Sequence, residues 1–139
     1  MTDKGSTRAF VDTNILVYAL VRDDHRTAAS EKILAENPVL SVQVLNECVD
    51  VLRRKLHWSW DRIEADLILI EELCGPPVAL THAAHRSAVE IAKRYNIRIY
   101  DALILAAALE AGCATLYSED MHSGQKVRSL TIRNPFTAA

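Results

Sequence analysis

The chain has 139 residues, of which 50% are hydrophobic and 24% are charged, and its formal net charge is −2. This composition excludes a disordered chain, and 4 Gly and 4 Pro are too few for a linker-rich or collagen-like sequence. The longest uncharged apolar run, 102–109, is too short to cross a bilayer, so we expect no membrane association. The length predicts a single domain over residues 1–139, with a core from about 8 to 133 and short tails at both ends.

The cysteine count bears on the cellular compartment. Cys48, Cys74 and Cys113 form no CxxC pair, and an odd count argues against a disulfide framework. Together with a polar start that predicts no secretory signal, this favours a reducing cytoplasm. The small negative net charge gives no direct indication of a nucleic-acid partner.

Short apolar runs alternate with helical patterns along the chain. We expect strands at 8–11, 39–40, 78–80, 114–118 and 130–132. We expect helices at 15–20, from 28 to about 37, and at 42–56, 61–73, 82–95 and 101–111. Asp12, Ser41 and Thr81 suit the N-terminal caps of three helices, Asp23-Asp24 precede another, and Gly112 suits a C-terminal cap.

This alternation predicts an α/β fold, a single three-layer α/β/α domain with a short-stranded, mostly parallel central sheet. Right-handed crossovers place the carboxyl ends of parallel strands at one edge of the sheet. Ligands of such sheets bind in the crevice outside these carboxyl ends. Residues that follow each expected strand are therefore the first candidates for a site.

Acidic residues occupy these positions. Asp12 ends the first strand, and Glu119 and Asp120 end the strand at 114–118. Glu47 lies in the first two turns of the helix that follows the second strand, and Asp101 opens a later helix. The expected topology brings these carboxylates from distant parts of the chain to one edge of the sheet.

Carboxylates gathered in this way raise each other's pKa unless a cation lies between them. Oxygen ligands without a cysteine or histidine cluster favour Mg²⁺ or Mn²⁺ over Zn²⁺. Such an ion can activate water and neutralise charge on phosphate oxygens. The pattern therefore indicates metal-dependent phosphodiester hydrolysis.

Each acid also has a purely structural interpretation. Asp12 can be a helix N-cap, and Asp101 can interact with the positive end of a helix dipole. Glu47 can lie on a solvated helix flank, and Asp120 can belong to a turn. Four such coincidences at one edge are less expected than one shared site, so we favour the site.

Four blocks of the sequence carry a family resemblance: FVDTNILVYAL, SVQVLNE, IYDALILAAALEAG and LYSEDM. In this order and spacing they resemble the PIN-domain ribonucleases and, within these, the VapC-type toxins of toxin–antitoxin pairs. The resemblance extends from about residue 9 to 132. It assigns the four acids of the family to Asp12, Glu47, Asp101 and Asp120. Asp12 and Asp101 would then be the main metal ligands.

The resemblance also assigns supporting roles. Asn14 and Ser118 match polar positions that orient water and ligands. Glu119 has no fixed role in the family, so either Glu119 or Asp120 could face the metal.

The resemblance further implies an activity and partners. The expected activity is that of an endoribonuclease that leaves a 5′-phosphate and a 3′-hydroxyl, with RNA as the substrate and Mg²⁺ or Mn²⁺ as the cofactor. It also implies a homodimer and a cognate antitoxin whose C-terminal segment blocks the active site.

Removing the five acids of the candidate site changes the formal charge from −2 to +3, so the remaining surface is mildly basic and suits a phosphate backbone. The densest basic group is Arg53, Arg54 and Lys55. With His122, which follows Asp120 closely, these residues are candidate RNA contacts. Solvated surface charges are the commoner explanation of such groups.

Two other functions are compatible with the fold class. A non-catalytic PIN-type module that binds RNA or protein is expected to lack one of the acids, and none is missing. A phosphotransfer enzyme with an aspartyl intermediate would be favoured by a DxD pair, but residue 14 is Asn. We therefore prefer the nuclease and keep the non-catalytic module as the alternative.

Overall fold

The computed structural model describes residues 8–22 and 25–137, so the expected helix start at Asp23-Asp24 lies outside the described residues. The strands are β1 (Phe10–Val11), β2 (Thr115–Tyr117), β3 (Lys126–Val127) and β4 (Leu130–Arg133). The helices are α2 (Thr13–Val21), α3 (Arg26–Leu34), α4 (Val42–Asp50), α5 (Trp60–Cys74), α6 (His82–Tyr95) and α7 (Ile99–Glu110), with a π-helical segment η1 (Val51–Lys55) after α4.

The four strands form one sheet in the order β1-β2-β4-β3. β1 is parallel to β2, with Phe10 opposite Leu116, and β2 is parallel to β4, with Leu116 opposite Ile132. β3 is antiparallel to β4. The predicted α/β fold with a short-stranded, mostly parallel central sheet is confirmed.

Two expected strands are much shorter than predicted. The segments at 39–40 and 78–80 form single bridges, from Phe10 to Val39 and from Ser41 to Val78. The first ends at once because the hydroxyl of Ser41 accepts a hydrogen bond from the amide of Val44 and caps α4. The two-residue strand β3 was not predicted, since two residues give no recognisable alternation.

Caps fix the ends of several helices. The side chains of Asp12, Ser41 and Thr81 accept backbone hydrogen bonds at the starts of α2, α4 and α6, as predicted. Gly112, with φ of 77°, follows the end of α7 in the left-handed conformation that glycine adopts readily. Helix α7 begins at Ile99, two residues before its predicted start, so Asp101 lies in its first turn.

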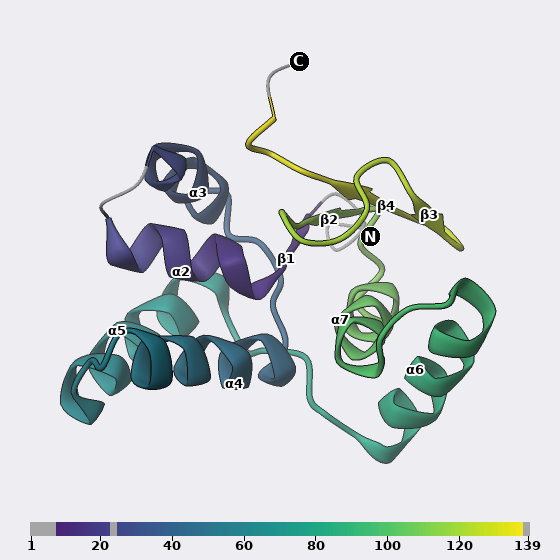
Figure 1. Ribbon diagram of the computed structural model, residues 1–139, viewed down its shortest axis with the longest axis horizontal. Coiled ribbons are helices and arrows are strands. Elements are labelled where there is room, and N and C mark those ends of the chain that lie inside the picture. Colours follow the sequence, from purple (N-terminus) through teal and green to yellow (C-terminus); the bar gives the residue numbers. More distant parts are fainter. Residues whose placement is uncertain (1–7, 23–24, 138–139) are drawn as a thin grey trace.

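Helix α7 is central to the hydrophobic core, since every residue from 102 to 108 is buried. It packs against α6 and also contacts α4, while α2 packs against α3 and α4. Figure 1 shows α2 to α5 on one side of β1, with α6 and α7 below the remaining strands. Among the described residues, no helix has the length and apolar character needed to cross a membrane.

Candidate active site

Asp12 lies where β1 ends and α2 begins, and it is only 4% exposed. One carboxylate oxygen accepts a hydrogen bond from the amide of Thr13 at 2.7 Å, and the other accepts from the hydroxyl of Ser118 at 2.7 Å. Burial raises the pKa of Asp12 to about 6, although both hydrogen bonds oppose the shift, and the charges of Asp101 and Glu47 add to it. Asp12 is therefore both the cap of α2 and a buried acid beside other acids.

Ser118 and Asn14 connect Asp12 to the turn after β2. The fully buried hydroxyl of Ser118 donates to Asp12 and accepts from the amides of Asp120 and Met121, each at 3.2 Å. The side-chain amide of Asn14 donates to a carboxylate oxygen of Asp120 at 3.2 Å and to Asp12 at 3.5 Å. These two polar residues fix the relative positions of the first and fourth acids.

Glu47 projects from α4 toward the start of α2. Its carboxylate accepts a hydrogen bond from the hydroxyl of Thr13 at 3.3 Å and from the side-chain amide of Gln43 at 2.8 Å. Sequence reasoning missed both partners. Gln43 could have been found, since a residue one helical turn before Glu47 lies on the same face of the helix.

Asp101 lies in the first turn of α7. Burial raises its pKa, the charge of Arg98 opposes the shift, and the charge of Asp120 adds to it. Other acids of the set thus contribute to the raised pKa of both groups: Asp101 and Glu47 to that of Asp12, and Asp120 to that of Asp101.

A cleft of about 990 Å³ joins these residues. All four predicted acids line it: Asp12, Glu47, Asp101 and Asp120. Other lining residues that sequence analysis had selected are Asn14, Arg54 and Lys55. Polar lining residues that sequence analysis missed include Asn46, Asp50, Arg98 and Tyr100.

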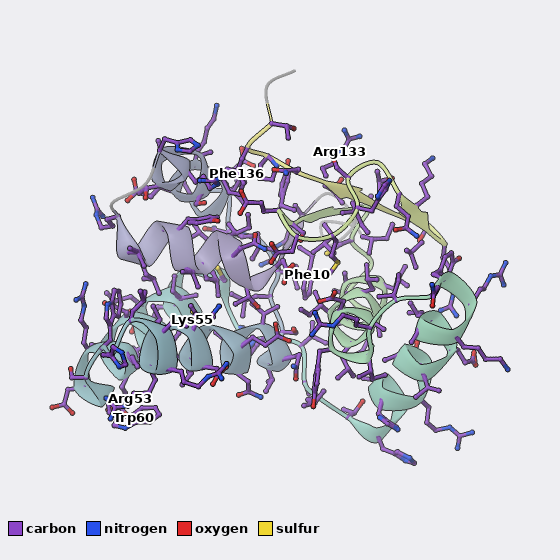
Figure 2. The ribbon with its side chains drawn as sticks, in the orientation of Figure 1. Phe10, Arg53, Lys55, Trp60, Arg133 and Phe136 are labelled. Atoms are coloured by element: carbon purple, nitrogen blue, oxygen red, sulfur yellow. The ribbon has the colours of Figure 1, made fainter. Side chains whose placement is uncertain are left out.

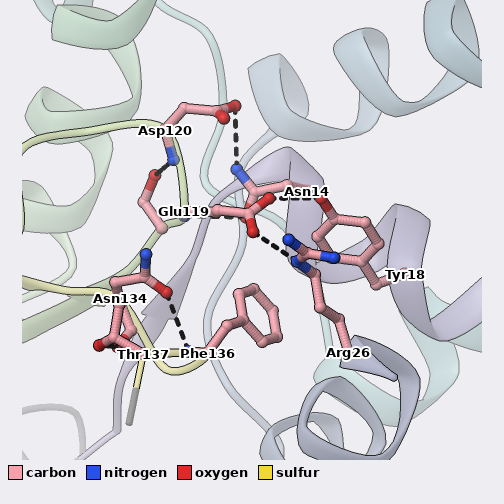
Figure 3. A network of polar contacts seen from close by, with 9 residues as sticks. Asn14, Tyr18, Arg26, Glu119, Asp120, Asn134, Phe136 and Thr137 are labelled. Carbon is pink, nitrogen blue, oxygen red and sulfur yellow. Dashed lines mark hydrogen bonds and ion pairs between the residues drawn. The ribbon is translucent and has the colours of Figure 1, made fainter. Parts of the chain in front are cut away.

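Glu119 does not line this cleft. Its carboxylate accepts a hydrogen bond from the hydroxyl of Tyr18 and forms an ion pair with Arg26, on the side of α2 and α3 (Figure 3). Asp120 is therefore the acid of this turn that faces the cleft, a choice that the sequence left open.

Two of the candidate RNA contacts lie elsewhere. The guanidinium of Arg53 lies 5.1 Å from the ring centroid of Trp60 and donates to the carbonyl of Trp58 at 3.0 Å. Figure 2 shows Arg53 and Trp60 together at the outer end of α4 and α5, whereas Lys55 lies nearer to α2. His122 lines a separate depression formed with residues 123–125.

The donor set suits a hard divalent cation. Within residues 8–22 and 25–137, no group of three or more His, Cys, Asp or Glu side chains has the geometry of a preformed metal site. The four acids nevertheless offer only oxygen ligands, and none of them is ion-paired with Lys or Arg in this part of the chain. Burial is the main cause of the raised pKa of Asp12 and Asp101, and a cation would relieve the repulsion from neighbouring acids that adds to it.

Fold and site together define an α/β protein with a four-acid cleft at the carboxyl ends of β1 and β2. The family model of the PIN domain matches residues 9–123, most of the chain. The chain therefore belongs to the PIN domain family. No curated protein shows significant sequence similarity to it.

Solved structures share this fold. One is VapC20 of Mycobacterium tuberculosis, a Sarcin-Ricin loop cleaving toxin, with 20% identity and a TM-score of 0.66 over 81% of this chain and 91% of that chain. Another is VapBC2 of Rickettsia felis bound to a DNA fragment from their promoter, with 18% identity and a TM-score of 0.63 over 92% of this chain and 98% of that chain.

Proposed function

We propose that this protein is a metal-dependent endoribonuclease that hydrolyses RNA phosphodiester bonds. The observation that carries the proposal is the convergence of four carboxylates, from four distant segments, on one cleft. Two of these acids have raised pKa values because they are buried near other acids. Such an arrangement is unfavourable without a cation and suits a site that binds one.

Within this proposal Asp12 and Asp101 are the main ligands of Mg²⁺ or Mn²⁺, with Asp120 and Glu47 completing the set. When bound, the ion would neutralise charge on the phosphate and activate the attacking water. Asn14 and Ser118 hold Asp12 and Asp120 in place through the hydrogen bonds described above.

RNA would approach along the basic part of the cleft. Arg54 and Lys55 line the same cleft as the acids, which supports a role in holding the phosphate backbone next to the scissile bond. Arg53 and His122, which lie outside the cleft, would contact only RNA that extends beyond it.

The proposal includes a biological setting. The similar structures are a VapC toxin and a VapBC complex, which supports a toxin role with a cognate antitoxin that covers the cleft. A single hydrophobic cluster that spans residues 10 to 132 supports one domain. The three cysteines are buried and free, which suits the reducing cytoplasm.

We also propose a homodimer. Besides Trp60 at its start, helix α5 exposes three large apolar side chains in its second half, Ile68 (51% exposed), Leu69 (61%) and Leu73 (44%). Apolar side chains grouped on one helix are typical of a face that another subunit covers.

Incubation of the purified protein with end-labelled structured RNAs, in Mg²⁺, in Mn²⁺ and in EDTA, tests the function. We expect cleavage that requires the metal and leaves a 5′-phosphate. Binding of RNA without cleavage in either metal would instead support the alternative, a non-catalytic PIN-type module that binds RNA or protein.

A further inference from the structure

Three consecutive side chains of the turn after β2 have different partners, and Figure 3 shows two of them, Glu119 and Asp120, pointing apart. Ser118 points into the core toward Asp12, and Asp120 lines the cleft. Between them, Glu119 turns back to Tyr18 of α2 and Arg26 of α3. Glu119 therefore connects the turn that carries the fourth acid to α2, whose Tyr18 also lines the cleft, and to α3, none of whose residues line it.

Aromatic rings enclose this contact. The guanidinium carbon of Arg26 lies 5.2 Å from the ring centroid of Tyr18 and 5.9 Å from that of Phe136. The rings of Tyr18 and Phe136 meet edge to face at 5.3 Å. Phe136 is itself held by Asn134, whose side-chain oxygen accepts from the amide of Phe136 at 2.9 Å.

The ion pair between Arg26 and Glu119 is mostly shielded from water, with side chains 28% and 21% exposed. A pair in this environment is screened less than one on an open surface. The pKa of Tyr18 is raised to about 12 by burial and by its hydrogen bond to Glu119, so the phenol remains a neutral donor at physiological pH.

The main chain of Glu119 leads directly into the site. Its amide donates to the side-chain oxygen of Asn14 at 3.2 Å, and the side-chain nitrogen of Asn14 donates to Asp120 at 3.2 Å. A displacement of Glu119 would therefore shift the partner that orients the carboxylate of Asp120.

We propose that Glu119 is a positioning residue, which anchors the 118–121 turn to Tyr18 and Arg26 so that Asp120 faces the cleft, with Phe136 shielding the anchor. Glu119 itself touches neither metal nor RNA. This inference rests on the proposed function, because it assigns Asp120 to the metal site.

The test compares Glu119→Gln with Glu31→Gln as a matched control. Glu31 of α3 also forms an ion pair with the residue that ends α2, Arg22, at 2.9 Å, and this pair does not involve the 118–121 turn. Three quantities are measured: Mn²⁺ binding to the metal-free protein by calorimetry, kcat and KM for RNA cleavage, and hydrogen exchange at the amides of residues 119 and 120.

We expect Glu119→Gln to weaken Mn²⁺ binding and lower kcat by about tenfold, the lower part of the range seen when residues that support metal ligands are replaced. KM for RNA should not change, amide exchange at 119 and 120 should accelerate, and Glu31→Gln should behave as wild type. Tyr18→Phe, which removes only the hydroxyl, should act in the same direction. Because Tyr18 also lines the cleft, amide exchange at 119 and 120 in Tyr18→Phe decides the anchoring role if Glu119→Gln does not fold.

A folded Glu119→Gln protein with wild-type Mn²⁺ binding and kcat would overturn the proposal, as would equal decreases in the Glu31→Gln control. If the wild type neither binds Mn²⁺ nor cleaves RNA, the proposed function fails. Amide exchange then decides the anchoring role by itself: faster exchange only in Glu119→Gln supports it, and unchanged exchange overturns it.

Discussion

The carboxylate of Asp12 caps helix α2 with one oxygen and accepts a hydrogen bond from the hydroxyl of Ser118 with the other. The structural and the functional interpretations of this residue are therefore compatible. At the sequence level a strand followed by Asp-Thr-Asn predicts the cap, and the same strand end predicts a place at the ligand-binding edge. The depth of burial, which raises the pKa of Asp12, depends on residues packed from elsewhere in the chain.

Replacement of Asp12 by Asn is expected to abolish RNA cleavage and to stabilise the metal-free protein at pH 7. The pKa of Asp12 rises on folding from 3.8 to about 6, so the folded state binds the proton more tightly than the unfolded chain. As the pH rises from about 4 to about 6, the free energy of unfolding of the wild type should fall by up to about 3 kcal/mol relative to that of the variant. Thermal unfolding of both proteins in EDTA over this pH range measures the difference. If the wild type instead became more stable relative to the variant as the pH rises, this would contradict the raised pKa of Asp12.

Replacement of Ser118 by Ala is expected to raise the pKa of Asp12 above its present value of about 6. The hydroxyl of Ser118 donates to the carboxylate and favours its charged form, so its removal favours the protonated form. A carbon-13 NMR titration of the Asp12 carboxyl in metal-free protein measures the shift. Ser123→Ala, whose hydroxyl accepts from the amide of Asn134, is the control and should leave the titration unchanged. An equal midpoint in wild type and Ser118→Ala would be inconsistent with this role.

At the scale of elements, caps and apolar spacing predicted most helices, because both are local properties of the chain. The observed elements differ from the predicted ones where tertiary contacts determine the local backbone conformation. The expected helix at 42–56 ends as the π-helical segment η1, which a search for 3.6-residue periodicity does not detect. The pairing of β3 with β4 depends on a turn between two very short strands and leaves almost no pattern in the sequence.

The three basic residues at the end of η1, which sequence analysis treated as one group, reach two different places. Arg54 and Lys55 line the cleft, whereas Arg53 contacts Trp58 and Trp60. The double variant Arg54→Ala/Lys55→Ala, made in the inactive Asp12→Asn protein, should bind RNA more weakly. The slope of log affinity against log salt should fall by about 1 for each RNA phosphate that the variant no longer neutralises.

Arg53→Ala in the same inactive background is the matched control for this measurement. Because its guanidinium lies against Trp60, outside the cleft, we expect little change in the salt dependence of RNA binding. An effect of Arg53→Ala equal to that of the double variant would show that the RNA follows the outer end of α4 and α5 instead of the cleft.

At the scale of the whole molecule, the meeting of four acids at one edge could be predicted because parallel strands end on the same side of a sheet. The sequence could not separate Glu119 from Asp120, since this depends on which way each side chain leaves one turn. It also carried no signal for Arg98 and Tyr100, which reach the cleft only because α7 packs against α4.

The proposed homodimer is tested by Leu69→Glu on the exposed face of α5. Because Leu69 is largely exposed, the charged side chain should not disturb the core but should prevent a second subunit from covering this face. Light scattering after size-exclusion chromatography should give a dimer for the wild type and a monomer for the variant. Val89→Glu on α6, also at an exposed apolar position, should remain a dimer. A monomeric wild type would refute the proposal.

The most direct test of the metal-dependent nuclease is to measure binding and cleavage of the same structured RNA by wild type, Asp12→Asn and Asp101→Asn. We predict that the wild type cuts in Mg²⁺ or Mn²⁺ and not in EDTA, leaving a 5′-phosphate. Both variants should bind the RNA and fail to cut it, because the basic side chains of the cleft are intact while the metal ligands are not. Cleavage by a folded Asp12→Asn protein, or cleavage by the wild type in EDTA, would contradict the four-acid site.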